Sequence, residues 1–371
     1  MQILILLGLA VLGFGFWFLG FNADPTRSMY GYLFAFICAL TIPLGCMVYV
    51  LIQHLTRAGW SVLTRRIAEF GMVVVPVFAL LFLPIAYLGN DLFPWSHAEH
   101  LDEVLLKKAP YLNMQFFMIR AAIYFVIWAV IGVWFYKKSL QQDTDPSVTR
   151  KLWKWSTLAV ILFALSTSFA SFDWLMSLQP HWYSTVFGVY FFAGCFLAGL
   201  AFISLMLMRS TVPVTKEHYQ DLGKLLFGFT VFWAYIGFSQ FMLYWYANIP
   251  EETEFYLMRL EDGWAGVSWA LLFTNFLIPF FLIMSRHAKR NQKFFAFGCI
   301  WIMLAHFLDI YWLVMPNYSG ENWSAFLAYD LAALVGLLAL LLLSVIYVMQ
   351  GKSLIPRGDP RLKESFAFEN Y

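Results

Sequence analysis

Ten long apolar stretches, separated by short polar segments, dominate the pattern along the chain. Each holds about 20 or more mostly hydrophobic residues, the length that an α-helix needs to cross the hydrocarbon core of a bilayer. They cover residues 3–21, 29–52, 67–88, 115–136, 155–175, 187–208, 222–247, 264–285, 294–314 and 327–349. The pattern therefore predicts an all-α polytopic membrane protein with about ten transmembrane helices.

Composition and charge support this interpretation and give the helices a direction. Of the 371 residues 61% are hydrophobic and only 12% are charged, which is more apolar surface than a soluble protein of this size can bury. Most of the 24 Lys and Arg residues fall on one side of the predicted membrane; the opposite loops carry only Arg27, Lys107, Lys108 and Arg259. Because basic loops stay in the cytoplasm, we expect both termini to be cytoplasmic.

The first apolar stretch is predicted to be a retained helix. Its start, "MQILILLG", has no basic segment, and "LGFNADPTRS" offers no clear small-residue cleavage site. A cleaved leader is the alternative.

Features of the chain recur at a distance of four helices. Two long outer loops, residues 89–114 and 248–263, are acidic and each contain an early proline, while Asp173 and Asp309 both stand seven residues before a proline. An even spacing implies two copies that run the same way through the membrane, a parallel repeat. We therefore predict four parts: residues 1–28 (first helix and outer loop), 29–186 (first four-helix bundle), 187–326 (second four-helix bundle) and 327–371 (last helix and cytoplasmic tail), with the first and last helices peripheral.

Few ionisable side chains occur within the spans, and each is a candidate for function because charge in hydrocarbon is costly. They are Arg120, Asp173, His306, Asp309 and Asp330, all placed by helix geometry in the outer half of the membrane. His306 and Asp309 stand at i and i+3 on one helix face and can hold a proton between them. Such acceptors suit a proton path or the oxidation of a quinol, which releases two protons with two electrons.

Structural roles are the alternatives for each of these side chains. Asp173 is equally well explained as a helix cap, and Asp330 as a carboxylate favoured by the dipole at a helix N-terminus. Arg120 can extend to the outer interface or pair with a loop carboxylate, and the His306/Asp309 pair can be a hydrogen bond between bundles.

Other polar residues complete the candidate list. His181, next to Pro180 at the outer face, is retained as a candidate, whereas surface positions are expected for His54, His97, His100, His218 and His287. Gln240 is a candidate for a hydrogen-bonding position along a proton path or for a contact to quinone. The side chains that could also hydrogen-bond along such a path are Thr167, Ser168, Ser171, Tyr235, Ser239 and Asn275.

Cofactor-binding motifs are missing from the sequence. The four cysteines, Cys38, Cys46, Cys195 and Cys299, lie in apolar stretches and form no C-x-x-C, so we expect buried packing residues rather than iron–sulfur or zinc ligands. Only His306 is predicted within a span, which disfavours a bis-histidine haem. We expect this chain to bind no metal and no redox cofactor of its own.

The stretch "FASFDWLMSLQPHWYSTVFGVYFFAG", residues 169–194, resembles the NrfD-like (polysulfide-reductase membrane-subunit) family, and within it the second such subunit of bacterial alternative complex III. The resemblance implies a multi-pass subunit of a quinol:cytochrome c oxidoreductase in the bacterial inner membrane, in a respiratory or photosynthetic chain. It implies an iron–sulfur protein, multihaem cytochrome c subunits and a sister NrfD-like subunit as partners, with lipids around them. The haem c and the clusters belong to those partners.

The resemblance leaves open whether this chain is catalytic. It implies a scaffold with a possible proton conduit, and the sister subunit is the better candidate for the site of quinone or menaquinone. A stand-alone ion- or proton-coupled transporter is the main alternative, and a structural anchor for redox partners is a third; nothing in the sequence suggests a nucleic-acid partner.

Overall fold

The computed structural model describes residues 2–97, 102–261, 263–320 and 323–369. Within them, ten helical segments are long and apolar enough to cross a membrane, which confirms the predicted count and the all-α polytopic class. The first six spans are α1 (Gln2–Ala23), α2 (Pro25–Leu55), the broken helix α3 (Val62–Met72), α4 (Val75–Leu81) and α5 (Leu83–Leu88), then α7 (Met114–Gln142), α8 (Val148–Trp174) and α9 (Phe187–Arg209). The last four are α10 (Lys216–Ala247), the interrupted helix α12 (Trp264–Leu271) and α13 (Ile278–Met284), α15 (Gln292–Val314) and α16 (Leu327–Met349).

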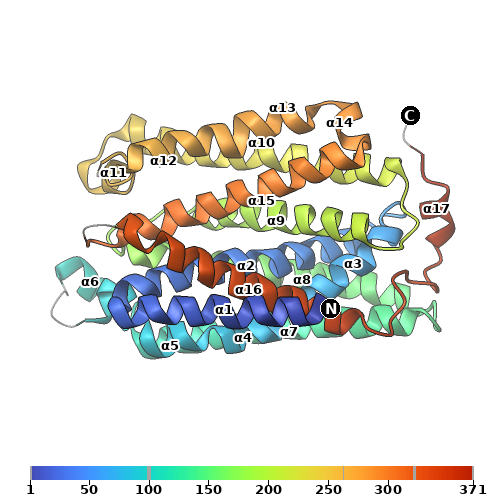
Figure 1. The fold of residues 1–371 in the computed structure, drawn as a ribbon, viewed down its shortest axis with the longest axis horizontal. Helices are drawn as coiled ribbons and strands as arrows, with labels where there is room; N and C mark the ends of the chain where they lie inside the picture. The colour runs from blue at the N-terminus through green and yellow to red at the C-terminus, as the bar shows by residue number, and fades with distance from the viewer. Residues whose placement is uncertain (1, 98–101, 262, 321–322, 370–371) are drawn as a thin grey trace.

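Short helices lie at both ends of the bundle. Residues 89–113 contain α6 (Glu103–Lys108), and residues 248–263 contain α11 (Pro250–Leu257); together these two segments form what we call the acidic end. The opposite end, which we call the basic end, carries α14 (Arg286–Arg290), α17 (Leu362–Phe366) and the start of α1 (Figure 1). The even number of spans places the two ends of the chain on the same side, as predicted.

Helix starts are set by local caps that the apolar pattern does not show. The Asp24 carboxylate accepts a hydrogen bond from the backbone N–H of Arg27 at 2.9 Å, and Pro25 occupies the first turn. α2 therefore begins four residues before the predicted position 29. Arg27, predicted to lie in an outer loop, belongs to its first turn.

Two spans are interrupted, which the sequence pattern did not anticipate. The third span breaks near Val73 and again at Phe82, just ahead of Pro76 and Pro84, because proline removes a helical hydrogen bond and clashes with the preceding turn. In the eighth span a π-helical segment, Leu272–Leu277, precedes Pro279. The third and eighth spans are not equivalent in the predicted repeat.

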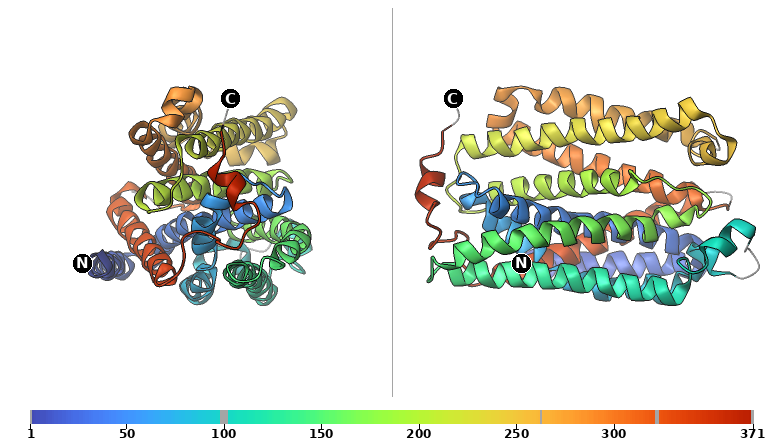
Figure 2. Two further views of the ribbon diagram at one scale, coloured as in Figure 1. Left: turned by 90° about the vertical axis from the view of Figure 1, so that its right-hand side faces the viewer. Right: turned by 180° about the vertical axis from the view of Figure 1, so that it is seen from behind.

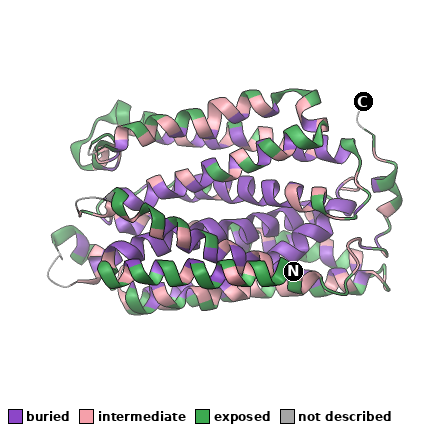
Figure 3. Ribbon diagram, in the orientation of Figure 1, coloured by how far each residue is buried: buried purple, intermediate pink, exposed green. Residues whose placement is uncertain are grey.

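The helices run side by side, with α2 and α9 at the centre (Figures 1 and 2). These are also the most deeply buried spans, as the purple helices of Figure 3 show. The two cross at Gly45 and Gly199, where a Cβ on Gly45 would lie 1.9 Å from the Cys195 carbonyl oxygen. Small residues allow this close backbone approach, the usual packing of membrane helices. The division into two bundles of four stays a prediction.

The first and last spans pack on each other at one side of the bundle. α1 lies against α16, and Gly13 of α1 leaves no room for a Cβ beside Gly336 of α16. Much of α1 is exposed, with Leu4 and Leu12 more than 70% accessible. Such an apolar outward face suits contact with lipid.

The C-terminal tail folds back across the basic end. Arg65 of α3 binds Asp359 at 2.6 Å, Arg66 donates to the Ser353 carbonyl, and Ser365 donates to the Trp60 carbonyl. Glu69 pairs with both arginines, at 3.3 and 2.9 Å. The Arg65–Asp359 ion pair and the two hydrogen bonds hold the tail against α3, while Glu69 fixes the two arginines.

Candidate functional site

A cavity of about 460 Å³ opens between α10, α12 and α15 toward the acidic end. Its walls are mainly aromatic and aliphatic, with polar groups from only a few residues. The side chains in the lining that can donate or accept a hydrogen bond include Tyr190, Trp233, Gln240, Tyr256, Arg259 and Trp312. A concave apolar site with a few polar groups is typical of a site for an amphipathic small molecule.

Arg259 is a buried cation at this cavity. It is only 1% exposed, and its guanidinium donates to the backbone carbonyls of Phe255 at 2.7 Å and Leu313 at 3.0 Å. It also stacks on the Phe255 ring, 3.5 Å from its centroid. Burial lowers the pKa of Arg259 to about 9, and no carboxylate of the described residues forms an ion pair with it. A cation held by neutral partners favours a ligand that brings partial negative charge.

Asp309 lies behind the wall of the same cavity. Its carboxylate accepts hydrogen bonds from the Tyr190 hydroxyl and, at 3.1 Å, from the Trp233 indole N–H. Both donors line the cavity, while Asp309 itself is 2% exposed. No cation among the described residues pairs with it. A carboxylate held only by neutral donors can take up a proton without breaking an ion pair, and Tyr190 connects it to the cavity.

His306 lies one turn from Asp309 but has different partners. Its Nε2 atom is 3.0 Å from the Thr41 hydroxyl of α2, and its ring packs on Gly194 of α9 so closely that a Cβ there would lie 2.7 Å from Cε1. No hydrogen bond joins His306 to Asp309 in the described part of the chain. The expected shared proton is therefore not present in this arrangement, because the two side chains have different hydrogen-bond partners: Thr41 for His306, and Tyr190 and Trp233 for Asp309.

Asp173 is an ion-pair partner rather than a helix cap. It accepts two hydrogen bonds from Arg120, at 2.7 and 3.0 Å, and one from the Tyr124 hydroxyl at 2.7 Å. The structural alternative of a cap is wrong because the carboxylate turns toward α7. Arg120 also stacks on Tyr111, 3.8 Å from the ring centroid, so it pairs inside the bundle rather than extending to the interface or to a loop carboxylate. Asp173 and Asp309 thus resemble each other in their tyrosine donor and differ in the cation.

Asp330 is a second paired carboxylate. It stands in the first turn of α16, as predicted, and Arg27 of α2 binds both of its oxygens at 3.0 and 2.7 Å. Tyr311 donates to the same carboxylate at 3.3 Å. The ion pair with Arg27, which the sequence pattern placed in a loop, holds the group in addition to the helix dipole.

The remaining candidates fall in different places. Gln240 lies at the cavity, where its amide N–H donates to Tyr256 at 3.0 Å and its carbonyl accepts from Ser184 at 2.8 Å. His181 is 2.7 Å from Asp102 on the exposed surface of the acidic end and does not join the cavity. The hydrogen bonds from Leu105 N–H and His181 lower the pKa of Asp102.

Several other polar residues occupy positions that differ from the predictions. His54 and His218 are buried within spans, at 5% and 0% exposure, and are not surface histidines. Tyr235, considered as a joint of a proton path, is 63% exposed on the outer surface of α10. Asn275 donates to the Ala305 carbonyl, and His100 lies outside the described residues.

The cysteines are buried, as predicted, and all four are free thiols. No three or more His, Cys, Asp or Glu side chains in the described ranges gather in a geometry that could hold a metal ion.

Sequence reasoning missed Tyr190, Trp233 and Arg259, which make the chemistry of the cavity. Tyr190 lies among the aromatic residues of "FGVYFFAG", and the sequence pattern places Arg259 in an outer loop. The signal that points to Arg259 is its isolation, since it is a basic residue within an acidic, aromatic outer segment.

Comparison with known proteins does not assign the chain to a family. No family model matches the chain, and a search of curated proteins finds no match. The functional interpretation therefore rests on the geometry above and on the resemblance of residues 169–194.

Proposed function

We propose that this multi-pass membrane protein is a subunit of a quinol:electron acceptor oxidoreductase of the alternative complex III kind, in a bacterial inner membrane. We further propose that it contacts the quinol head group in the cavity beside Arg259. The observation that carries the proposal is the joint placement of a buried Arg259 and a cation-free Asp309 on one aromatic cavity.

The cavity matches the chemistry of a quinol. Aromatic walls such as Trp233 and Trp312 suit a flat ring, and a guanidinium N–H of Arg259 suits a ring oxygen, which becomes more negative as the hydroxyl loses its proton. Tyr190 can accept a proton from the ligand while its own proton passes to Asp309. The two electrons need an acceptor outside this chain, which the resemblance assigns to an iron–sulfur protein.

Proton release would proceed away from the cavity. From Asp309, the chain offers His306 one turn nearer the basic end, and then Thr41 on α2 at 3.0 Å. Because His306 and Asp309 are not in contact, transfer between them requires an intervening water or a side-chain movement. The Asp309 carboxylate is thus the first group of the proposed route to hold a released proton, which it receives through Tyr190.

The test is quinol:cytochrome c reductase turnover, with proton release, in membranes that carry single substitutions in this chain. Asp309→Asn should leave the subunits assembled and lower turnover or proton yield, and Arg259→Gln should raise KM for the quinol more than it lowers kcat. Glu254→Gln and Arg209→Gln, on exposed residues, are the matched controls. Wild-type turnover and proton yield in both test variants would overturn the proposed contact and leave the chain a scaffold.

A stand-alone ion-coupled transporter is the second candidate. The interruption of the eighth span by a π-helical segment beside the cavity favours it, because substrate sites in transporters are typically formed by discontinuous helices. Purification distinguishes the two functions. Co-purifying c-type haem and iron–sulfur protein supports the oxidoreductase subunit, whereas an isolated chain that drives proton-coupled uptake in liposomes supports the transporter.

A further inference from the structure

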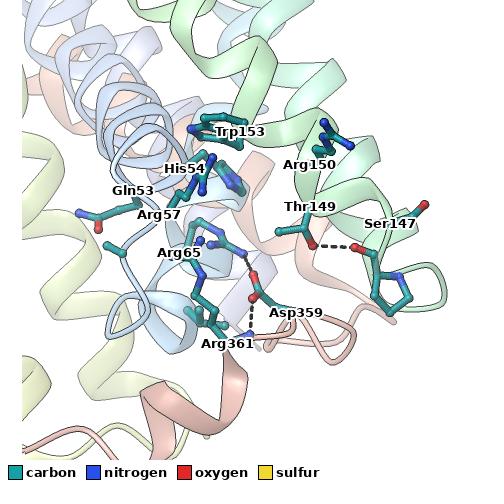
Figure 4. A pocket seen from close by; sticks show the side chains of 13 residues that line it. Gln53, His54, Arg57, Arg65, Ser147, Thr149, Arg150, Trp153, Asp359 and Arg361 are labelled. Atoms are coloured by element: carbon teal, nitrogen blue, oxygen red, sulfur yellow. Dashed lines mark hydrogen bonds and ion pairs between the residues drawn. The ribbon is translucent and has the colours of Figure 1, made fainter.

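A second cavity, of about 690 Å³, lies at the basic end, far along the helices from the first. It is formed by the end of α2, the start of α3, the loop before α8, the first turns of α8 and the C-terminal tail (Figure 4). Four arginines line it: Arg57, Arg65, Arg150 and Arg361. Among the described residues, Asp359 supplies the only carboxylate in the lining.

The single carboxylate is already neutralised. Asp359 accepts from Arg65 at 2.6 Å and from the Gln142 amide at 3.2 Å. Burial acts to raise the pKa of Asp359, but the Arg65 guanidinium and the hydrogen bonds from Arg361 N–H and Gln142 together outweigh it, and the pKa lies below its usual value. Arg57, Arg150 and Arg361 form no ion pair with a carboxylate of the described residues. The cavity therefore has an excess of positive charge.

His54 adds a buried polar atom without a partner. Its ring is 5% exposed and lines the cavity, yet its Nε2 atom is bonded to no group in the described part of the chain. Arg57, three residues later, holds a left-handed backbone conformation with φ of 53° and stacks on Trp153, 3.5 Å from the ring centroid. The turn after α2 thus directs a guanidinium to the cavity rim.

An apolar groove of about 220 Å³ lies beside this cavity on the outer surface of α7 and α8. Trp134, Trp155, Leu158 and Leu162 line it, with Trp155 and Leu158 roughly half exposed. Phe135 belongs to the groove, and its ring is 5.7 Å from that of His54, which belongs to the cavity. From Trp155 to Leu162 the groove follows α8 for roughly 10 Å toward the membrane centre.

We propose that the basic cavity and the adjoining groove together bind one acidic phospholipid. Arginine forks match phosphate oxygens in geometry and charge, and basic pockets between helices at the cytoplasmic surface are suited to acidic head groups. The groove provides the apolar surface for an acyl chain, which a free phosphate would leave uncovered. Because Arg361 belongs to the tail and Arg57 to the turn after α2, the bound head group bridges these two segments.

Native mass spectrometry of the purified full-length chain tests the site, with phosphatidylglycerol or phosphatidylcholine added in detergent. Wild-type chain should retain phosphatidylglycerol in preference to phosphatidylcholine. The double variant Arg57→Gln/Arg150→Gln should reduce its affinity for phosphatidylglycerol about tenfold, equivalent to about 1.4 kcal/mol. Lys137→Gln/Lys138→Gln, which removes two charges from the same end but outside the cavity, should bind as the wild type does.

The outcomes separate the possible sources of binding. Equal retention of both lipids by the wild type, or equal losses in both double variants, would overturn the proposal, since only general surface charge would then act. Displacement of phosphatidylglycerol by millimolar inorganic phosphate would assign the cavity to a free anion and overturn the lipid assignment. Arg57 and Arg150 are exposed, so circular dichroism should show unchanged helix content in the variants.

Discussion

Arg27 and Asp330 form a two-point ion pair although 303 positions separate them in the chain. The guanidinium is 0% exposed and the carboxylate 1% exposed. Gly31 makes the approach possible, because a Cβ there would lie 2.0 Å from one carboxylate oxygen. The pair ties the second span to the last one and fixes how α16 packs against the bundle.

Substitution of one partner of this ion pair should destabilise the folded protein. Asp330→Leu leaves the Arg27 guanidinium buried without its anion, and we expect the free energy of unfolding to fall by about 3–5 kcal/mol. The double variant Arg27→Met/Asp330→Leu should recover most of that loss. Thermal unfolding followed with a thiol-reactive dye measures both, because all four cysteines are buried in the folded chain. Additive losses in the double variant would contradict the pair's coupling.

Asp173 and Asp309 should respond differently to the same substitution. Asp173→Asn leaves Arg120 without its anion and should destabilise the protein by about 3 kcal/mol. Asp309→Asn keeps an acceptor for Tyr190 or Trp233 and should cost only about 1 kcal/mol. The same dye assay measures the two variants side by side. Equal losses would show that Asp309, too, is held by a cation in the protein.

The crossing of α2 and α9 depends on the absence of side chains. Gly45→Ala would place a methyl group 1.9 Å from the Cys195 carbonyl oxygen, so the helices must separate, at a cost of about 1–3 kcal/mol or more. Gly228→Ala is the matched control, since no atom lies within 4 Å of the Cβ position. Alanine there should be neutral or stabilising by up to about 1 kcal/mol. Unfolding temperatures that rise in both variants would exclude a tight crossing at Gly45.

Docking of the C-terminal tail should depend on pH through Asp359. Its pKa in the folded chain lies below the usual 3.8, so the ionised carboxylate stabilises the docked tail. That contribution is present above about pH 4 and is lost as pH falls through the lowered pKa. Hydrogen exchange of the tail amides, corrected for intrinsic rates, should be slow at pH 7 and faster below pH 4.

Substitution of Asp359 should reproduce the acid effect at neutral pH. Asp359→Asn removes the anion that binds Arg65 and should speed exchange in the tail at pH 7. Asp145→Asn, on the exposed loop before α8, is the control and should leave the tail protected. Equal protection in all three proteins would mean that the remaining tail contacts, such as those of Ser365, suffice to hold it.

The sequence alone determined the class of protein and the number of spans. These properties depend on composition and on runs of about 20 apolar residues, which are local and additive along the chain. The intramembrane positions of Asp173, Asp309 and Asp330 followed in the same way, from their distance to the helix ends. Even the free, buried cysteines could be predicted from their apolar neighbours.

The tertiary structure alone decided which of these carboxylates pair with a cation. Asp173 and Asp330 meet arginines from other helices, Arg120 and Arg27, whereas Asp309 meets only Tyr190 and Trp233. His306 and Asp309 share one face of a helix but do not form a hydrogen-bonded pair, because their side chains reach different partners. Partners separated by tens to hundreds of residues depend on helix packing and on close glycine contacts, and these cannot be obtained from the periodicity of a single helix.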